Sequence, residues 1–325
     1  MSKTQAVESE RRLRVGLAQI SPVWLDRKAT TDKVVDFIHQ AGQLDCELVV
    51  FGEALLPGYP FWVDATDGAR FESQLQKELY AHYATEAVVP ERGDLEAVCE
   101  AAACAKCMVI LGTIERAIDR GGHSLYCSLM KISSEGRLLG SHRKLMPTYE
   151  ERLVWSPGDG QGLQVHALGD FHVGALNCWE NWMPLPRASL YAQGEDVHVA
   201  IWPGAVRNTE DITRFIAKES RSYVLSVSGL LRREDIPSTL PHADLLVEKC
   251  PEVMADGGSC IADPSGQWLV EPVSNQEKLI TAELDPQKVL QERQNFDPSG
   301  HYSRPDVTQL IVNRQRQSTV KFEDN

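Results

Sequence analysis

The stretch Phe171-His172-Val173-Gly174-Ala175-Leu176-Asn177-Cys178 is the most informative part of this sequence. Its apolar and β-branched residues predict a buried strand, and residues 185–191 predict a helix soon afterwards. Cys178 is therefore expected on a strand-to-helix turn, with its sulfur facing the crevice beyond the strand. The positive end of a nearby helix favours the thiolate over the thiol. Two interpretations follow: Cys178 is a nucleophile, or it is a small buried apolar residue, as most free cysteines are.

A carboxylate and an ammonium follow two other predicted strands. Glu53 comes directly after the apolar run 47–52, and Lys144 comes directly after the extended run 137–143. In α/β proteins, ligands bind beyond the carboxyl ends of the strands. We therefore expect the thiol, the carboxylate and the ammonium at one site, although a single Glu or Lys after a strand is usually a solvated loop residue.

Three segments resemble the signature segments of the nitrilase superfamily of carbon–nitrogen hydrolases. They are residues 51–60 (FGEALLPGYP), 142–148 (HRKLMPT) and 177–184 (NCWENWMP), and their order and separations also fit that family. The Cys-Trp-Glu-Asn segment and the Pro-Gly-Tyr-Pro-Phe-Trp loop are most similar to those of true nitrilases, whereas aliphatic amidases match less well. The resemblance extends over about 14–312, nearly the whole chain.

The resemblance implies a role for each matching residue. Cys178 is the nucleophile, Glu53 the general base and Lys144 the cation that stabilises the tetrahedral intermediates. The second glutamate of the family matches Glu151, although Glu150 beside it leaves that alignment open by one position. Such a set converts a nitrile through a thioimidate and a thioester into an acid and ammonia, with water as the second substrate. No metal and no organic cofactor is required.

Three classes of function remain open at this point. The first is a nitrilase, and the second is a nitrile or cyanide hydratase or an amidase of the same superfamily. The third is a non-catalytic binding or scaffold protein, which the complete Glu-Lys-Cys set disfavours because function resides in the site rather than in the fold.

Aromatic residues near the predicted site suggest the character of the substrate. We expect four of them to line an apolar pocket for an aryl or arylalkyl nitrile. The alternative is that they pack in the core, as aromatic residues do equally well. The four are Tyr59, Trp62, Trp179 and Trp202.

Composition disfavours several other classes of partner. Lys and Arg number 33 against 46 acidic residues, a net charge of −13, which disfavours nucleic acid and anionic membranes. No run of 18 apolar residues occurs, so no transmembrane helix is expected. Eight cysteines in a chain without a recognisable export signal indicate free thiols in the cytoplasm.

Cys99, Cys104 and Cys107 have a spacing found in plant-type iron–sulfur proteins. Yet residues 94–106 are Ala-rich and have helical periodicity, whereas an iron–sulfur loop is irregular. We predict that these three thiols are small residues on the buried face of a helix.

The pattern of elements predicts one α/β domain at 13–313, with a polar segment at 1–12 and a mobile tail at 314–325. Strands alternate with helices, but the hairpins 124–132/138–142 and 259–263/267–270 indicate mixed rather than parallel sheets. The nitrilase resemblance implies a four-layer α-β-β-α sandwich, two mixed sheets with helices outside. The other predicted strands are 13–20, 47–51, 108–114, 171–178, 197–202, 223–229 and 278–284, and the predicted helices are 30–43, 71–83, 94–106, 185–191 and 209–221.

The resemblance also implies a homo-oligomer that is built on a dimer and can extend into a spiral filament. The insertion 64–88 and the stretch 296–311 support this expectation, because a monomer so acidic has little reason to expose many apolar groups. The apolar residues concerned are Phe71, Leu75, Leu79, Tyr80, Tyr83, Tyr302 and Leu310.

Overall fold

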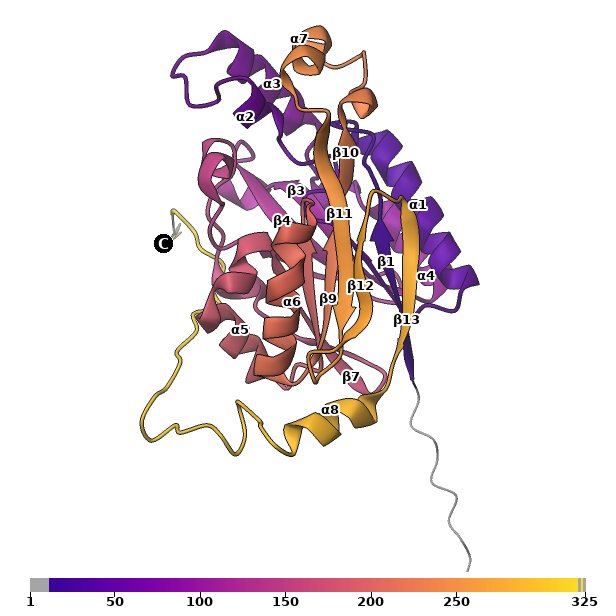
Figure 1. The fold of residues 1–325 in the computed structure, drawn as a ribbon. Coiled ribbons are helices and arrows are strands. Elements are labelled where there is room, and N and C mark those ends of the chain that lie inside the picture. Colours follow the sequence, from indigo (N-terminus) through magenta and orange to yellow (C-terminus); the bar gives the residue numbers. More distant parts are fainter. Residues whose placement is uncertain (1–11, 321–322, 324–325) are drawn as a thin grey trace, which may run out of the picture.

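Two mixed β-sheets lie face to face at the centre of the protein (Figure 1). The computed structural model describes residues 12–320 and 323. The first sheet has the strand order β13 (Lys278–Leu284), β1 (Leu13–Gln19), β2 (Leu48–Phe51), β3 (Met108–Arg116), β4 (Leu125–Ile132) and β5 (Leu138–Arg143). The second has the order β10 (Leu230–Arg232), β11 (Val253–Ala262), β9 (Tyr223–Ser228), β8 (Val197–Trp202), β7 (Phe171–Asn177) and β6 (His166–Leu168), and β12 (Trp268–Ser274) pairs with β11.

Each sheet combines parallel and antiparallel pairs. β1, β2 and β3 are parallel to one another, as are β7, β8 and β9. Parallel neighbours need a crossover connection, and four helices provide it: α1 (Arg27–Gln43), α4 (Glu96–Ala105), α5 (Pro184–Tyr191) and α6 (Val206–Ser220). The hairpins β4–β5 and β11–β12 are antiparallel, as the sequence predicted.

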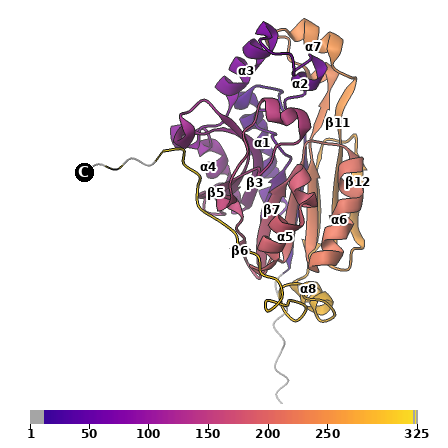
Figure 2. The same ribbon diagram turned by 90° about the vertical axis from the view of Figure 1, so that its left-hand side faces the viewer.

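Helices cover the outer faces of both sheets (Figure 2). Val34 and Ile38 of α1 and Val98 of α4 pack against the first sheet, and Ile212 and Ile216 of α6 pack against the second. The space between the sheets is filled by buried side chains, among them Leu17, Val50, Ile110, Val199, Ile201, Leu225 and Val227. The predicted four-layer α-β-β-α sandwich is thus confirmed.

Shorter elements lie at the two ends of the sandwich. α2 (Trp62–Ala65), α3 (Gln74–Glu86) and α7 (Ala243–Lys249) lie together at the end drawn uppermost in Figure 1, and α8 (Pro286–Arg293) lies at the other. Within the described residues, six short 3-10 turns occupy connections: Pro90–Arg92, Ile118–Arg120, Tyr149–Leu153, Gly160–Gly162, Cys178–Trp182 and Arg233–Asp235. None of the helices in the described residues is long and apolar enough to cross a membrane.

Most predicted elements are present within a few residues of their predicted ends. The helix expected at 71–83 begins only at Gln74, because Glu72 has a positive φ of 58° and the Ser73 side chain caps the first turn. The sequence did not reveal β6 and β10, since each has three residues and is too short to show a period-2 pattern.

Residues 314–320 of the C-terminal tail contact the body of the protein in this structure, and the mobility expected of the tail stays a prediction. Arg316 Nη1 lies 2.9 Å from Asp159 Oδ1, and the Gln317 backbone N–H donates to Asp159 Oδ2 over 3.0 Å. Arg120 in turn donates to the Gln317 carbonyl oxygen over 2.9 Å. This part of the tail is therefore held against the body of the protein. Most of the predicted N-terminal segment (1–11), and positions 321–322 and 324–325, lie outside the described residues.

The three clustered cysteines also differ in part from the prediction. Cys107 is buried, but Cys99 is only half-buried and Cys104 is exposed. Cys99 and Cys104 lie five residues apart on α4, which places them on different sides of a helix with 3.6 residues per turn. These three thiols do not form a group with the spacing of metal ligands among the described residues.

Candidate active site

Three loops bring the predicted catalytic side chains together between the sheets. Glu53 follows β2, and its backbone N–H donates to the carbonyl oxygen of Trp202 at the end of β8, over 3.1 Å. Lys144 follows β5, and its N–H donates to the carbonyl oxygen of Cys127 on β4, over 2.7 Å. Cys178 begins the 3-10 turn after β7 with a positive φ of 43°. The backbone thus places all three groups before any side-chain contact is made.

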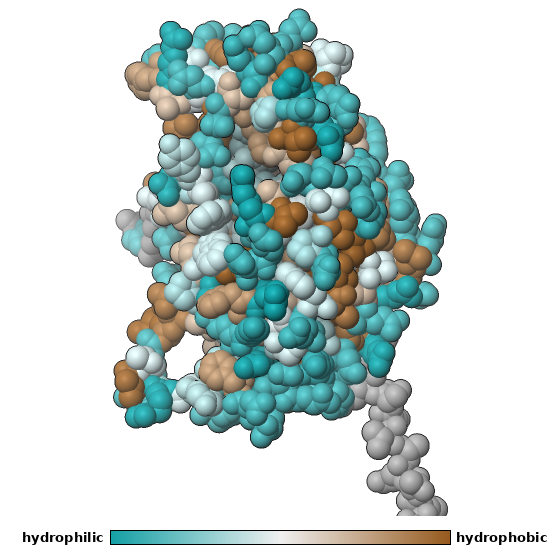
Figure 3. Space-filling model, viewed as in Figure 1, coloured by the Kyte–Doolittle hydropathy of each residue, from teal (hydrophilic) through white to brown (hydrophobic). Residues whose placement is uncertain are grey.

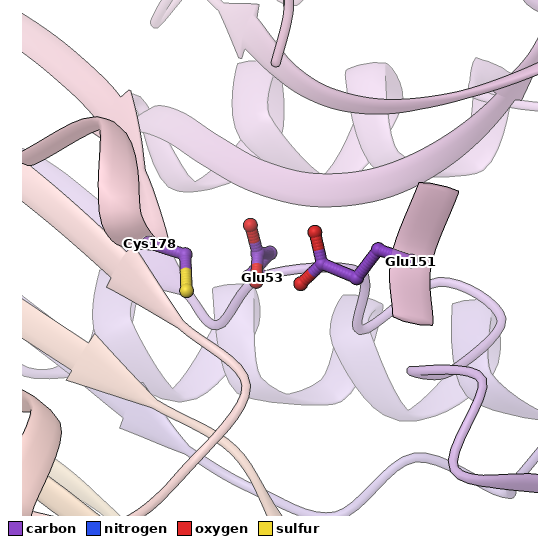
Figure 4. A group of neighbouring side chains, drawn as sticks. All are labelled: Glu53, Glu151 and Cys178. Carbon is purple, nitrogen blue, oxygen red and sulfur yellow. The ribbon is translucent and has the colours of Figure 1, made fainter. Parts of the chain in front are cut away.

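The side chains form a buried cluster of opposite charges. Lys144 Nζ lies 2.9 Å from Glu53 Oε1 and 2.7 Å from Glu151 Oε2. The sulfur of Cys178 and carboxylate oxygens of both glutamates lie within 4.8 Å of one another, with Glu53 between the other two (Figure 4). This thiol and these carboxylates also form the one group in the described chain with metal-ligand spacing. The Lys144 ammonium already supplies their cation, so they are poorly suited to a metal.

Burial and neighbouring charges shift the pKa values of all three groups in this cluster. Desolvation raises the pKa of Glu53 to about 7, against the attraction of Lys144 and with the repulsion of Glu151. Desolvation would lower the pKa of Lys144, but Cys178 and the two glutamates hold it well above its usual value, so the ammonium persists. Burial, followed by the nearby Glu53 carboxylate, raises the pKa of the Cys178 thiol well above its usual range.

The expectation that a helix N-terminus makes Cys178 a thiolate is therefore wrong. The 3-10 turn that begins at Cys178 has only five residues, and Cys178 itself is only 3% exposed. Desolvation and two adjacent carboxylates outweigh the small dipole of such a turn. The thiol is protonated until a base removes its proton. Glu53 is suited to that task, because its Oε2 is buried and has no hydrogen-bond partner in the described residues.

The structure places Glu151, rather than Glu150, against the lysine. Glu151 Oε2 accepts from the Thr148 backbone N–H over 2.6 Å, and its Oε1 accepts from the Tyr59 hydroxyl over 2.8 Å. Glu150 is only half-buried, and the Tyr59 hydroxyl lies 3.4 Å from its Oε1. Of the two adjacent glutamates, Glu151 is the one that contacts Lys144, and its role as the second glutamate stays a prediction.

A cavity of about 700 Å³ opens above the cluster. Tyr59 and Trp179 line it, as the sequence predicted, together with Phe61. Trp62 and Trp202 do not: both are fully buried, and their expected contact with substrate is corrected. Other residues of its wall were not recognised from the sequence, because they come from the connection between β8 and α6, from the start of α6 and from β11; they include Gly204, Arg207, Asn208, Val253 and Met254.

Trp62 and Trp202 pack in the interior of the protein instead of lining the cavity. The Trp62 ring packs edge-on against Tyr83, with ring centroids 4.6 Å apart. Trp202 belongs to the apolar cluster beneath Cys178, beside Ile212. A tryptophan at a strand end or in a loop after a catalytic residue has the same sequence signal whether its side chain faces the cavity or the core.

Comparison with known proteins agrees with this geometry. Residues 14–294 match the family described as "Carbon-nitrogen hydrolase". The chain belongs to the carbon–nitrogen hydrolase family. It is 38% identical to "Nitrilase 2" from an unknown prokaryotic organism, over 95% of each chain. It is 36% identical to a "Bifunctional nitrilase/nitrile hydratase" from Oryza sativa subsp. japonica, over 95% of this chain and 86% of that one.

Among solved structures, the carbon–nitrogen hydrolase from Helicobacter pylori G27 has the same fold, with a TM-score of 0.68. The likeness covers 91% of this chain and 97% of that one at 18% sequence identity.

The site of the present chain also contains a buried carboxylate, that of Glu180, which was not predicted from the sequence. Glu180 accepts from the backbone N–H of Leu145 over 2.6 Å and from that of Asn177 over 2.9 Å. Leu145 follows Lys144 and Asn177 precedes Cys178, so one side chain joins the lysine loop to the cysteine turn. His142 Nε2 lies 3.0 Å from the same carboxylate. Burial opposes its charge, but the contact with His142 and the two N–H groups keeps the pKa of Glu180 low.

The sequence carried a readable signal for Glu180, since Asn177 and Glu180 have the three-residue offset of a capping box. Cys127 had no comparable signal. Its thiol lies 3.5 Å from Glu53 Oε1, and this contact depends on the pairing of β4 with β3 and β5.

Proposed function

We propose that this carbon–nitrogen hydrolase is a nitrilase, which converts an organic nitrile and water into a carboxylic acid and ammonia. The position of the Cys178 thiol carries the proposal. It lies on the floor of a cavity, beside a carboxylate with a pKa of about 7 and close to an ammonium. The nitrile as substrate is supported by relatives at 36–38% identity that are named as nitrilases.

The reaction begins with proton transfer from the thiol to Glu53. As Cys178 loses its proton, its sulfur attacks the nitrile carbon, and the nitrile nitrogen takes the electron pair and then a proton to give a thioimidate. Lys144 stabilises the negative charge that develops on nitrogen and later on oxygen, because it remains an ammonium in a site sheltered from water.

Hydrolysis completes the cycle with two water molecules. Glu53 activates the first water, which adds to the thioimidate carbon, and loss of ammonia leaves a thioester. The second water adds to the thioester carbonyl, the carbon–sulfur bond breaks, and the acid leaves as the Cys178 thiol is restored. Glu151 holds Lys144 in place and is itself fixed by Thr148 and Tyr59.

A nitrile hydratase activity is the second candidate, because one relative is named as bifunctional. The two outcomes share all steps up to the tetrahedral intermediate formed by water. Loss of ammonia from it gives the acid, whereas loss of the Cys178 thiolate gives the amide. Product analysis that measures acid, amide and ammonia together separates them. Acid and ammonia in equal amounts support the nitrilase, and amide without ammonia contradicts it.

Tyr59 and Trp179 supply the aromatic part of the proposed substrate site. Both line the cavity beside Cys178, so an aryl or arylalkyl nitrile has apolar surface to pack against. A panel of aliphatic, aryl and arylalkyl nitriles tests this preference directly.

We further propose a cytoplasmic homo-oligomer that is built on a dimer, with a spiral filament as its extended form. Leu79 and Tyr83 do not support this, because they are buried within the chain itself. Phe71 is 89% exposed and Ile311 is 90% exposed, and the stretch after α8 loops away from the body (Figure 1). A location in the reducing cytoplasm is supported by eight unpaired cysteines.

The face drawn in Figure 3 is mostly hydrophilic, with a narrow hydrophobic band to the right of its centre. Exposed apolar side chains also surround the loops after Lys144 and Cys178, where a second subunit would cover them. They are Met146, Tyr149, Leu153, Trp182, Met183 and Leu185.

A further inference from the structure

The backbone of Cys178 has an unusual conformation that something must hold. Its φ of 43° lies in the left-handed region, which non-glycine residues seldom adopt. The carbonyl oxygen of Cys178 accepts from Asn181 Nδ2 over 2.8 Å. The same Nδ2 lies 3.4 Å from the carbonyl oxygen of Leu176. Both contacts are buried, so the Asn181 amide fixes the turn from beneath.

His198 fixes the amide in turn. Because Asn181 donates through Nδ2, its Oδ1 points the other way and must accept. His198 Nε2, on β8, lies 2.7 Å from this oxygen. His198 Nδ1 lies 3.0 Å and 3.1 Å from the two oxygens of Glu195. An amide oxygen only accepts, so Nε2 of His198 donates to Asn181, while Nδ1 lies against the Glu195 carboxyl group.

The sequence makes room for this arrangement on the neighbouring strand. Gly174 of β7 is paired in register with His198 of β8. A β-carbon at Gly174 would lie 1.9 Å from Glu195 Oε1, so the carboxylate occupies the space that a side chain would need. Asn181, Glu195 and His198 are all fully buried. Three polar residues with no access to water and complete partners form a chain that ends at the nucleophile.

We propose that His198, held by Glu195, is a positioning residue for the nucleophile and acts through Asn181 on the Cys178 backbone. The proposal rests on the assignment of Cys178 as nucleophile. In this role His198 keeps the Cys178 sulfur directed at the nitrile carbon. A displacement of about 1 Å at a reacting atom can reduce the rate about a hundredfold. His198 does not touch substrate, so KM is expected to change little.

Two substitutions of His198 separate positioning from stability. His198→Gln places an amide N–H near the position of Nε2 and keeps the bond to Asn181, but it leaves Glu195 without its partner. His198→Asn places an N–H near the position of Nδ1 and keeps the bond to Glu195, but it releases Asn181. We expect His198→Gln to lower Tm more, and His198→Asn to lower kcat more, by about 10- to 100-fold with KM within about twofold.

His172 provides a matched control, because it is an exposed histidine of β7 whose Nδ1 lies 3.1 Å from Asp196. His172→Gln and His172→Asn should leave kcat unchanged. If kcat of the His198 variants follows Tm, or if His198→Asn retains wild-type kcat, the positioning role is overturned.

Asn181→Asp keeps the proposal testable should the His198 variants not fold. The aspartate is isosteric and still accepts from His198, but it no longer donates to the Cys178 carbonyl oxygen. In the folded variant we expect a kcat reduced by at least about tenfold and slower alkylation of Cys178 by iodoacetamide, with KM little changed. Wild-type kcat in folded Asn181→Asp contradicts the proposal. An active Cys178→Ala protein would instead contradict the nucleophile assignment itself, so the two failures are distinguishable.

Discussion

Replacing Glu53 by Gln should make the enzyme inactive and, at neutral pH, more stable. The amide has the size of the carboxylate but cannot take a proton from the Cys178 thiol or from water. Loss of a general base lowers the rate by about a hundredfold to ten-thousandfold. At the same time Gln carries no charge that must be buried beside Glu151. The two effects have opposite signs, which few substitutions in a core would produce.

The pKa of Glu53 sets the size of the stability effect. Folding raises it from 4.5 to about 7, and this value already includes the attraction of Lys144. The folded protein therefore binds this proton more tightly than the unfolded chain does. Stability falls as pH rises from 4.5 to 7, by about 1.4 kcal/mol for each pH unit or about 3 kcal/mol in all. Below pH 4.5 Glu53 is protonated in the folded and in the unfolded protein, so it causes no loss of stability there.

Urea unfolding of wild type and Glu53→Gln at pH 4.5 and pH 8, at one protein concentration, measures this difference. The free energy of unfolding of Glu53→Gln minus that of the wild type should be about 3 kcal/mol larger at pH 8 than at pH 4.5. In parallel, kcat/KM of the wild type should rise with pH through about 7, as Glu53 becomes able to accept a proton. A variant that is less stable than wild type at pH 8, or that retains more than about a tenth of its rate, would refute the reasoning.

Five further outcomes are expected. Cys178→Ala should abolish turnover in a folded protein, and iodoacetamide labelling followed by peptide mapping should show inactivation in step with modification of Cys178. Lys144→Ala should lose at least about a hundredfold in kcat, since it removes the cation at the reacting atoms. Glu151→Gln should lower kcat far more than Glu150→Gln, and the reverse order in steady-state assays would shift the second glutamate by one position. Glu180→Gln should lower kcat by about tenfold or more with little change in KM, because the Gln amide cannot accept from two backbone N–H groups as the carboxylate does; unchanged kcat would limit Glu180 to a structural role. Light scattering should give a mass above the 36.2 kDa of one chain, and a fully active monomer would exclude the proposed dimer.

The parts of the site that the sequence predicted share one property, their position at strand ends. Glu53, Lys144 and Cys178 each follow a run that is readable as a strand, and a sheet brings such ends together. Side-chain direction was not readable in the same way. Trp179 faces the cavity and Trp202 faces the core, although both lie at or just beyond the end of a buried strand. Which way each points depends on packing across the second sheet.

The ionisation state of Cys178 could not be predicted from its neighbours in the sequence, for a related reason. Its neighbours in the chain suggested a helix N-terminus and a thiolate, but the pKa is set by burial and by Glu53 and Glu151, which are distant in sequence. Glu195 and His198 were missed because their pairing with Asn181 exists only once β7 and β8 are parallel neighbours. Long-range electrostatics and strand pairing are thus the two kinds of information that local patterns lacked.

The contact between the two sheets explains how a cluster of buried charges keeps its geometry. Glu53, from the first sheet, donates its backbone N–H to the end of β8 in the second. Glu180, from the second, accepts from Leu145 beside Lys144 in the first. Each catalytic loop is therefore tied to the opposite sheet, and the loops move relative to one another only if the sandwich itself opens. Isolated buried charges are strongly unfavourable, so such ties on both sides are what allow a protonated thiol, its base and a lysine to stay within reach of one substrate atom.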